Sequence, residues 1–371
     1  MFFEKNDGYS YSPKVLVAPL DWGLGHATRC IPIIYSLLNN GATVFIAADG
    51  PVRLLLEKEL PQASFLPLSG YGIQYSRRGK WFSLKLFLQF PRIFMAIYKE
   101  HRWLKRTQQQ HVFDLVISDN RPGLFNRNVT CIYITHQLAI KTGNSITAWL
   151  AKKIHYRFIN QFDHCWVPDN QAGNLLAGEL SHPTLMPRTE VTYTGALSRF
   201  SRYSAEKKYA LLVLLSGPEP QRSIFETTLL IQLEQFTQPV IFIRGLPAEK
   251  TLPAISNKNI EIHNHLDSIA LNQAILQSEI ILSRSGYTTV MDLAALQKKA
   301  ILVATPGQTE QEYLSQYLLN KKMFFTANQE NFVLAEALQN AAVFPFAFTQ
   351  NTVGNTYKKL VSDILQSLKN Q

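Results

Sequence analysis

The chain of 371 residues has few cysteines and no long apolar run. Cys30, Cys131 and Cys165 stand far apart, so the sequence predicts neither a disulfide framework nor a zinc knuckle. No segment reaches the roughly 18 uncharged apolar residues of a membrane span, and the first residues lack the features of a secretion signal. Charged residues make up 17% and hydrophobic residues 46%, which excludes a disordered chain. We expect a folded, cytoplasmic protein with free thiols.

Positive charge is concentrated in one segment of the chain. The net charge is +10, and residues 77–106 carry nine basic side chains against Glu100 alone. The same segment contains large apolar side chains such as Trp81 and Phe94. A stretch of this kind can lie in the surface of an anionic membrane, and it can equally be a pair of core helices with a basic solvent face. No nucleic-acid-binding motif accompanies it, so we expect no nucleic-acid partner.

Short apolar runs alternate with segments of helical length throughout the chain, and the second half restarts as the first began. The expected strands are KVLVA, TVFIAAD, DLVISD, CIYIT and HCWVPD, then YALLVLLS, PVIFIRG, IEIHN, EIILS and AILVAT. This alternation predicts an α/β protein with two parallel sheets. We expect an N-terminal Rossmann-like domain over residues 1–200 and a second one over 201–350. Residues 351–371 should form a helix that docks back on the body, and a cleft between the domains is the expected ligand site.

The first strand ends in the turn GLGH, whose glycines let backbone amides approach a ligand. A helical segment follows the turn, so these amides lie at a helix N-terminus, where anions bind. The dinucleotide pattern G-x-G-x-x-G is incomplete because Thr28 replaces its third glycine, although Asp49 stands at a suitable distance to bind a ribose. The turn is therefore either a dinucleotide loop or a device that places His26.

In the second half, the strand EIILS runs into Ser285-Gly286 and a helical segment that begins at Thr288. Hydroxyl side chains and glycine at a helix N-terminus form a suitable seat for a diphosphate. Asp292 follows about one turn later and could accept the hydroxyls of a ribose, although it could equally be an exposed helix residue.

A further strand leads into Pro306-Gly307 and the polar run Gln308 to Glu312. Amides and carboxylates on such a loop suit the hydroxyls of a sugar. The run also predicts a helix cap, with Thr309 as N-cap and Glu312 closing a capping box.

The order of these motifs resembles a GT-B glycosyltransferase, in particular the family 28-like branch of UDP-N-acetylglucosamine transferases that complete lipid II. The resemblance covers nearly the whole chain and is closest over RSGYTTVMDLAALQKKAILVATPGQTEQEY. SGPEPQR resembles the loop that opens the family's second domain, and ITHQL resembles a loop on the acceptor side. The resemblance implies two Rossmann-like domains that face a cleft.

Residue roles follow from the resemblance, position by position. It implies donor contacts at Gly25, Arg199, Ser216, Gly217, His265, Leu266, Ser285, Gly286, Tyr287, Thr288, Asp292, Gln308, Glu310 and Gln311. It implies acceptor-side positions at Gly23, Thr135, His136 and Gln137.

The resemblance also implies an inverting transfer without a metal or cofactor, because the nucleotide sugar is itself the substrate. His26 would be the general base for an acceptor hydroxyl, and the departing diphosphate would need fixed positive potential. The acceptor would be a glycan or a lipid-linked sugar, collected by a peripheral enzyme from the inner face of the cell membrane.

Departures from the family leave the sugar and acceptor open. The loop from Ser216 to Arg222 is rich in proline where the family has glycine, and position 312 is Glu where an amide is usual. Three alternatives remain: a nucleotide-sugar 2-epimerase of the same fold, a dinucleotide-binding protein that uses Gly23, Gly25 and Asp49, and a non-catalytic adaptor at a membrane surface.

Overall fold

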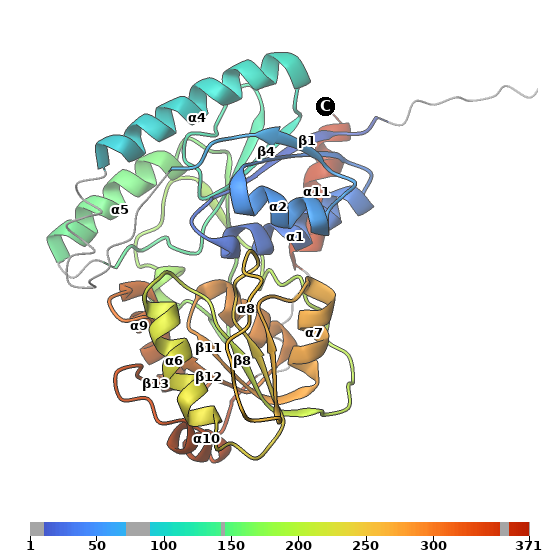
Figure 1. Ribbon diagram of the computed structural model, residues 1–371. Helices are drawn as coiled ribbons and strands as arrows, with labels where there is room; N and C mark the ends of the chain where they lie inside the picture. Colours follow the sequence, from blue (N-terminus) through green and yellow to red (C-terminus); the bar gives the residue numbers. More distant parts are fainter. Residues whose placement is uncertain (1–10, 72–89, 142–144, 349–355, 371) are drawn as a thin grey trace, which may run out of the picture.

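The computed structural model describes residues 11–71, 90–141, 145–348 and 356–370. It contains two parallel sheets, one above the other in Figure 1, each wrapped by helices. The prediction of an α/β protein with two Rossmann-like domains is confirmed.

The N-terminal sheet has seven strands in the order β3-β2-β1-β4-β5-β6-β7, and all neighbours are parallel. Its strands are β1 (Lys14–Pro19), β2 (Thr43–Ala48), β3 (Ser64–Pro67), β4 (Leu115–Asp119), β5 (Thr130–Ile134), β6 (His164–Val167) and β7 (Glu190–Tyr193). Its helices are α1 (Leu24–Asn39), α2 (Gly50–Glu59), α4 (Phe90–His111) and α5 (Ser145–Ile159), and a short 3-10 turn, η2, covers Gly178–Leu180.

The C-terminal sheet has six parallel strands in the order β10-β9-β8-β11-β12-β13. These are β8 (Tyr209–Leu214), β9 (Val240–Ile243), β10 (Ile260–His263), β11 (Ser278–Arg284), β12 (Ala300–Val303) and β13 (Phe325–Ala327). Its helices are α6 (Gln221–Leu233), α7 (Ser268–Leu276), α8 (Tyr287–Leu296), α9 (Thr309–Asn320) and α10 (Leu334–Ala342). The last helix, α11 (Thr356–Lys369), packs on the N-terminal domain.

All ten strands expected from the sequence are present. The described residues also form three further strands that the sequence did not predict. Central strands such as β1 and β9 are buried on both faces and therefore have continuous apolar runs. The strands that were missed, β3, β7 and β13, lie at sheet edges and are partly exposed along their length. Their sequences therefore lack the apolar run that identifies a central strand.

The chain crosses between the two sheets twice. β7 ends at Tyr193 and β8 begins at Tyr209, so the boundary expected near residue 200 lies in this connection. After α10 the chain returns to the N-terminal sheet, where α11 packs beside α1 (Figure 1). Val361, Leu365 and Leu368 are buried there, and Tyr357 N donates to Thr194 O.

Part of the basic apolar segment 77–106 lies outside the described residues, because these resume at residue 90. The remainder forms α4, which lies beside α5 on the outer side of the N-terminal domain (Figure 1). Within the described part of the chain, no helix is both long enough and apolar enough to cross a membrane.

Candidate active site

The GLGH turn forms the start of α1 at the carboxyl end of β1. Gly23 is the N-cap residue, and its φ of 92° lies in the region that favours glycine. The helix begins at Leu24, so His26 lies in its first turn. Thr28, at the position of the missing third glycine, is buried in the same helix, and its hydroxyl donates to Gly25 O.

The imidazole of His26 contacts a buried carboxylate that ends a neighbouring strand. His26 Nδ1 lies 3.2 Å from Asp119 Oδ2, at the carboxyl end of β4. Arg29, one turn along α1, donates from Nε to the same oxygen at 2.9 Å, and its NH2 group lies 2.9 Å from His26 Nδ1. Because β1 and β4 are adjacent and parallel, their ends bring α1 and Asp119 together.

The charges of this cluster favour a neutral His26 imidazole together with an ionised Asp119 carboxylate. Burial lowers the pKa of His26, and the Arg29 guanidinium lowers it further, against the opposing effect of Asp119. Burial alone would raise the pKa of Asp119, but Arg29 and His26 hold it well below its usual range. A neutral His26 whose Nδ1–H donates to Asp119 has an unprotonated Nε2, which is the form a general base requires.

A second histidine continues the cluster across the interface between the domains. Arg29 NH1 lies 3.0 Å from His136 Nδ1, and His136 Nε2 lies 2.7 Å from Glu310 Oε1 in the C-terminal domain. Gln137 also donates to the Glu310 carboxylate. Glu310, expected to face the sugar, is therefore held by the N-terminal domain in this structure.

The turn after β11 provides the candidate diphosphate seat. α8 begins at Tyr287, with Gly286 as an N-cap that has no side-chain hydrogen bond. Ser285 Oγ donates to Gln311 O at 3.0 Å, and Thr288 Oγ1 donates to Gly25 O at 3.2 Å. The nucleotide turn and the GLGH turn thus touch directly.

Tyr287, a predicted donor contact, lies between the two domains. Its side chain is buried, its hydroxyl donates to Pro168 O at 2.5 Å, and its ring stacks on His136 with centroids 4.2 Å apart. It therefore packs the two domains together.

The candidate ribose carboxylate, Asp292, is buried rather than exposed on its helix. Burial raises its pKa to about 6, against the opposing effects of Arg199 and of the Ser198 hydroxyl, which donates to Asp292 at 2.6 Å. Burial also lowers the pKa of Arg199. The two predicted residues are thus electrostatically coupled, and both are largely removed from water.

The remaining donor candidates lie on turns at the same edge of the C-terminal sheet. Ser216 and Gly217 are exposed after β8, and Gly217 has a φ of 106°. His265 and Leu266 follow β10, and partial burial of the His265 ring lowers its pKa although the residue as a whole is exposed.

The turn before α9 differs from the predicted capping box. The N-cap is Gln308 rather than Thr309, whose hydroxyl donates to Lys141 O instead. Glu312 accepts from Gly307 N, and Gln311 accepts from Thr305 N at 2.9 Å. The prediction of Thr309 as N-cap was wrong, because the Pro306-Gly307 turn closes one residue earlier.

The sequence prediction missed Asp119 and Arg29. Asp119 ends the expected strand DLVISD, and a carboxylate at the end of a central parallel strand signals a possible site residue. Arg29 lies one helical turn after His26. Of the other predicted positions, Thr135 is buried beside His136, and Asp49 caps α2 by accepting from Gly50 N.

Known proteins are similar to this chain in sequence and in fold. The glycosyltransferase family 28 C-terminal domain matches residues 222–350. Over these residues the chain is similar to family 28 glycosyltransferases. A curated relative from Haemophilus ducreyi, a UDP-N-acetylglucosamine–N-acetylmuramyl-(pentapeptide) pyrophosphoryl-undecaprenol N-acetylglucosamine transferase, is 27% identical over 198 residues. That alignment covers 52% of each chain, so this chain matches about half the length of its relative.

Solved structures establish the GT-B fold of this chain. MurG from Acinetobacter baumannii has a TM-score of 0.53 and 14% identity, over 96% of this chain and 100% of its own. A Listeria monocytogenes protein named as a UDP-N-acetylglucosamine 2-epimerase has a TM-score of 0.61 and 13% identity, over 96% of both chains. The fold is thus similar to proteins named for two reactions, while the family match indicates a glycosyltransferase.

Proposed function

We propose that this protein transfers a sugar, N-acetylglucosamine or another hexose, from a UDP-linked donor to an acceptor hydroxyl with inversion and without a metal. The observation that carries the proposal is the placement of His26. Its Nδ1 faces Asp119, and its turn touches the nucleotide turn through Gly25 and Thr288. A base beside a diphosphate seat is what an inverting transfer requires.

In the proposed reaction, the acceptor hydroxyl gives its proton to Nε2 of His26 while its oxygen bonds to the anomeric carbon of the donor. The bond from that carbon to the diphosphate oxygen breaks, and its electron pair leaves with the nucleoside diphosphate. Asp119 then stabilises the imidazolium that forms. The NH2 group of Arg29 can also donate to Nδ1 of His26 when Nδ1 carries no proton. The acceptor hydroxyl can therefore give its proton to Nε2 only when His26 carries its own proton on Nδ1.

The departing diphosphate would be stabilised at the N-terminus of α8. The first amides of a helix have no partner within it and carry partial positive charge. Gly286 leaves these amides free of a side-chain cap. Asp292 would accept hydrogen bonds from the ribose hydroxyls, and the segment with His265 and Leu266 would lie beside the nucleobase.

The proposal is tested with a panel of UDP-, GDP- and dTDP-sugars, first by thermal shift and then by assay of nucleotide release. We expect one donor class to raise the melting temperature, release that depends on an acceptor, and a product of inverted anomeric configuration. His26→Gln should bind the donor normally and lose turnover. Normal turnover in this variant would contradict the proposed base. A wild type that releases no nucleotide with any donor and acceptor would favour the non-catalytic adaptor.

The epimerase alternative has specific support in the Listeria structure. It predicts conversion of the donor sugar without any acceptor, which NMR of the donor alone would detect. The dinucleotide alternative predicts stabilisation by NAD and none by a nucleotide sugar. Asp49, its ribose candidate, already uses its carboxylate to cap α2.

We propose further that the acceptor is lipid-linked and that α4 and α5 contact the inner face of the cell membrane. Exposed apolar side chains lie on these helices and on a nearby loop: Phe94, Met95, Tyr98, Trp149, Leu150, Leu185 and Met186. Exposed basic side chains accompany them on α4: Arg92, Lys99, Arg102, Lys105 and Arg106. Such a surface suits an anionic membrane, because its basic side chains attract the headgroups and its apolar side chains enter the bilayer.

Flotation with phosphatidylcholine vesicles that contain phosphatidylglycerol tests the membrane proposal. We expect the protein to float with anionic vesicles and to remain behind with neutral ones. The double variant Tyr98→Glu and Trp149→Glu should stay in solution. Ile269→Glu, which replaces an 82% exposed side chain on α7, is the matched control and should float normally. Equal flotation of both variants would overturn the proposal.

A further inference from the structure

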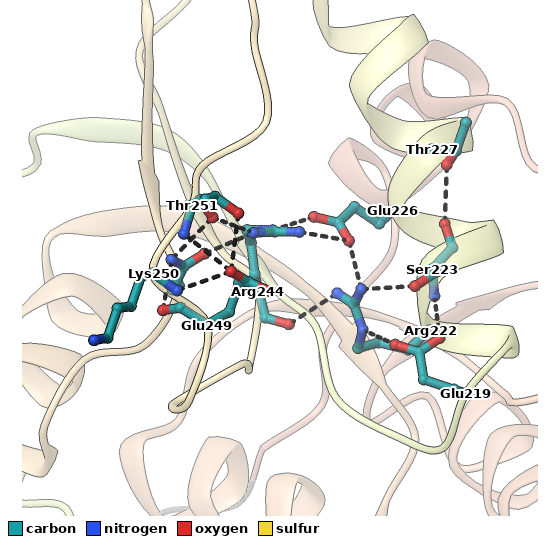
Figure 2. Close-up of polar contacts among 10 residues, drawn as sticks. Glu219, Arg222, Ser223, Glu226, Thr227, Arg244, Glu249, Lys250 and Thr251 are labelled. Carbon is teal, nitrogen blue, oxygen red and sulfur yellow. Dashed lines mark hydrogen bonds and ion pairs between the residues drawn. The ribbon is translucent and has the colours of Figure 1, made fainter.

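Three arginines, Arg222, Arg244 and Arg284, lie at the first turns of α6. They differ in whether a carboxylate pairs with their charge. Figure 2 shows Arg222 and Arg244 on either side of the buried Glu226 carboxylate, with Glu219 also paired to Arg222. Carboxylates accordingly raise the pKa of Arg222. These two arginines and two glutamates form a neutral cluster.

Arg284 is the third arginine, and its charge is not balanced. It ends β11, directly before Ser285-Gly286, and only 1% of its surface is exposed. No carboxylate lies within ion-pair distance of it among the residues that the structure describes. Burial alone lowers its pKa to about 10, and its Nε has no hydrogen-bond partner in the described part of the chain.

The contacts of Arg284 place its charge among the turns at the carboxyl edge of the sheet. NH2 donates to Gln221 O at 2.9 Å, at the start of α6, and NH1 donates to Ala304 O at 3.3 Å, just after β12. The guanidinium also lies 4.5 Å from the centroid of the Phe225 ring. One side chain thus ties together the turns after β8, β11 and β12.

A second polar group at this edge is also without a partner. Thr305 is 2% exposed, and its buried hydroxyl makes no hydrogen bond with any residue that the structure describes. A side chain added at Gly217 would come within 3.6 Å of that hydroxyl, so the turn after β8 lies against it. In open parallel sheets, ligands bind at this edge. A buried cation and an unpaired hydroxyl are stabilised when an anion binds nearby.

We propose that Arg284 is a positioning residue for the diphosphate of the donor. Its unbalanced charge provides positive potential beneath the diphosphate seat, and its two hydrogen bonds set the separation of the turns after β8 and β12. The inference rests on the proposed function and adds to it a residue that acts on the phosphates of the donor and not on its nucleobase.

The test compares the affinities of UDP and uridine, measured by calorimetry, in the wild type and in Arg284→Met. The ratio of the two affinities isolates the phosphates, so a general loss of stability does not alter it. We expect UDP to bind about tenfold more weakly to the variant, with the affinity for uridine unchanged, because the loss of one charged interaction has about this effect.

The control is Lys298→Met, which removes another buried cation that bonds to backbone carbonyls. Lys298 donates to Ser278 O and Leu276 O, at the opposite end of β11. Its removal should leave the ratio of the two affinities unchanged. If Arg284→Met does not fold, Arg284→Gln provides the same comparison with one hydrogen bond retained.

The outcomes separate this inference from the proposed function. A wild-type preference for UDP that persists undiminished in the Arg284 variant overturns the inference and leaves the proposed transfer intact. A wild type that binds no nucleoside diphosphate contradicts both. An equal loss of UDP and uridine affinity would show that Arg284 supports the fold without acting on the phosphates, and would also overturn the inference.

Discussion

Asp119 is the residue on which the proposed chemistry of His26 depends. In Asp119→Asn, the imidazole loses the group that orients Nδ1–H and stabilises the imidazolium, so we expect kcat to fall on the order of 10²-fold or more. Arg29 would also become a buried unpaired cation, at a cost of about 3–5 kcal/mol of stability. Steady-state kinetics on the folded variant measures the first effect, and urea unfolding measures the second.

Asp114→Asn is the matched control, because Asp114 precedes the same strand at its other end and accepts from Lys14 N. It should retain kcat. A normal kcat in Asp119→Asn would remove the carboxylate from the mechanism.

Asp292 predicts a pH dependence of donor affinity. Its pKa is raised to about 6, above the ordinary value of 3.8, so the ligand-free fold favours the protonated form. The contribution of this group to stability is therefore greatest at low pH and is lost as the pH rises to about 6. Ribose hydroxyls donate to the ionised form, so donor affinity should fall about tenfold per pH unit below that pKa.

Calorimetry with an intact nucleotide sugar between about pH 5 and pH 7 measures this dependence, since its diphosphate diester does not titrate there. Asp292→Asn should bind weakly with no pH dependence over this range. Equal wild-type affinity at both pH values would exclude the carboxylate as the ribose ligand.

Single residues were predictable from the sequence where a turn follows a buried strand. His26 and Glu310 follow such strands, and the structure joins both to one cluster across the domain interface through Arg29 and His136. Their partners were harder to predict, because His26 and Asp119 are 93 positions apart and meet only through the strand order of the sheet. The burial of Asp292 could not be predicted from the local sequence either, since it depends on the connection between the domains that carries Ser198.

At the scale of elements, α11 links the end of the chain to its first helix. Leu365 is 2% exposed and belongs to the apolar cluster that includes α1. We expect Leu365→Ala to lower the free energy of unfolding by about 2–5 kcal/mol, because it leaves a cavity in this contact. Chemical denaturation measures the change, with the exposed Gln366→Ala as a neutral control. Equal stability of the two variants would show that α11 does not dock in solution.

The elements were predictable to different degrees for physical reasons. Central parallel strands are apolar on both faces, so their pattern identifies them without knowledge of the fold. The edge strand β13 is partly exposed along all its residues, and its partner β12 supplies the register that the local sequence does not. The docking of α11 on the N-terminal sheet was expected only in general terms, since its apolar face matches many surfaces.

At the scale of the whole molecule, the two domains meet at Gly25. A side chain at this position would lie 2.9 Å from Thr288 Oγ1, closer than a carbon normally approaches an oxygen. In Gly25→Ala the Thr288 hydroxyl must therefore turn away from Gly25 O, which loses a contact between the GLGH turn and the nucleotide turn. We expect kcat/KM to fall about five- to tenfold with the stability of the N-terminal domain retained, because alanine suits a helix better than glycine.

A double-mutant cycle with Thr288→Ala identifies the cause of this loss. Thr288→Ala removes the hydroxyl that the new methyl group displaces, so the two substitutions together should cost less than the sum of their separate effects. Steady-state kinetics on the four proteins measures the coupling. Strictly additive effects would mean that domain closure does not depend on this contact.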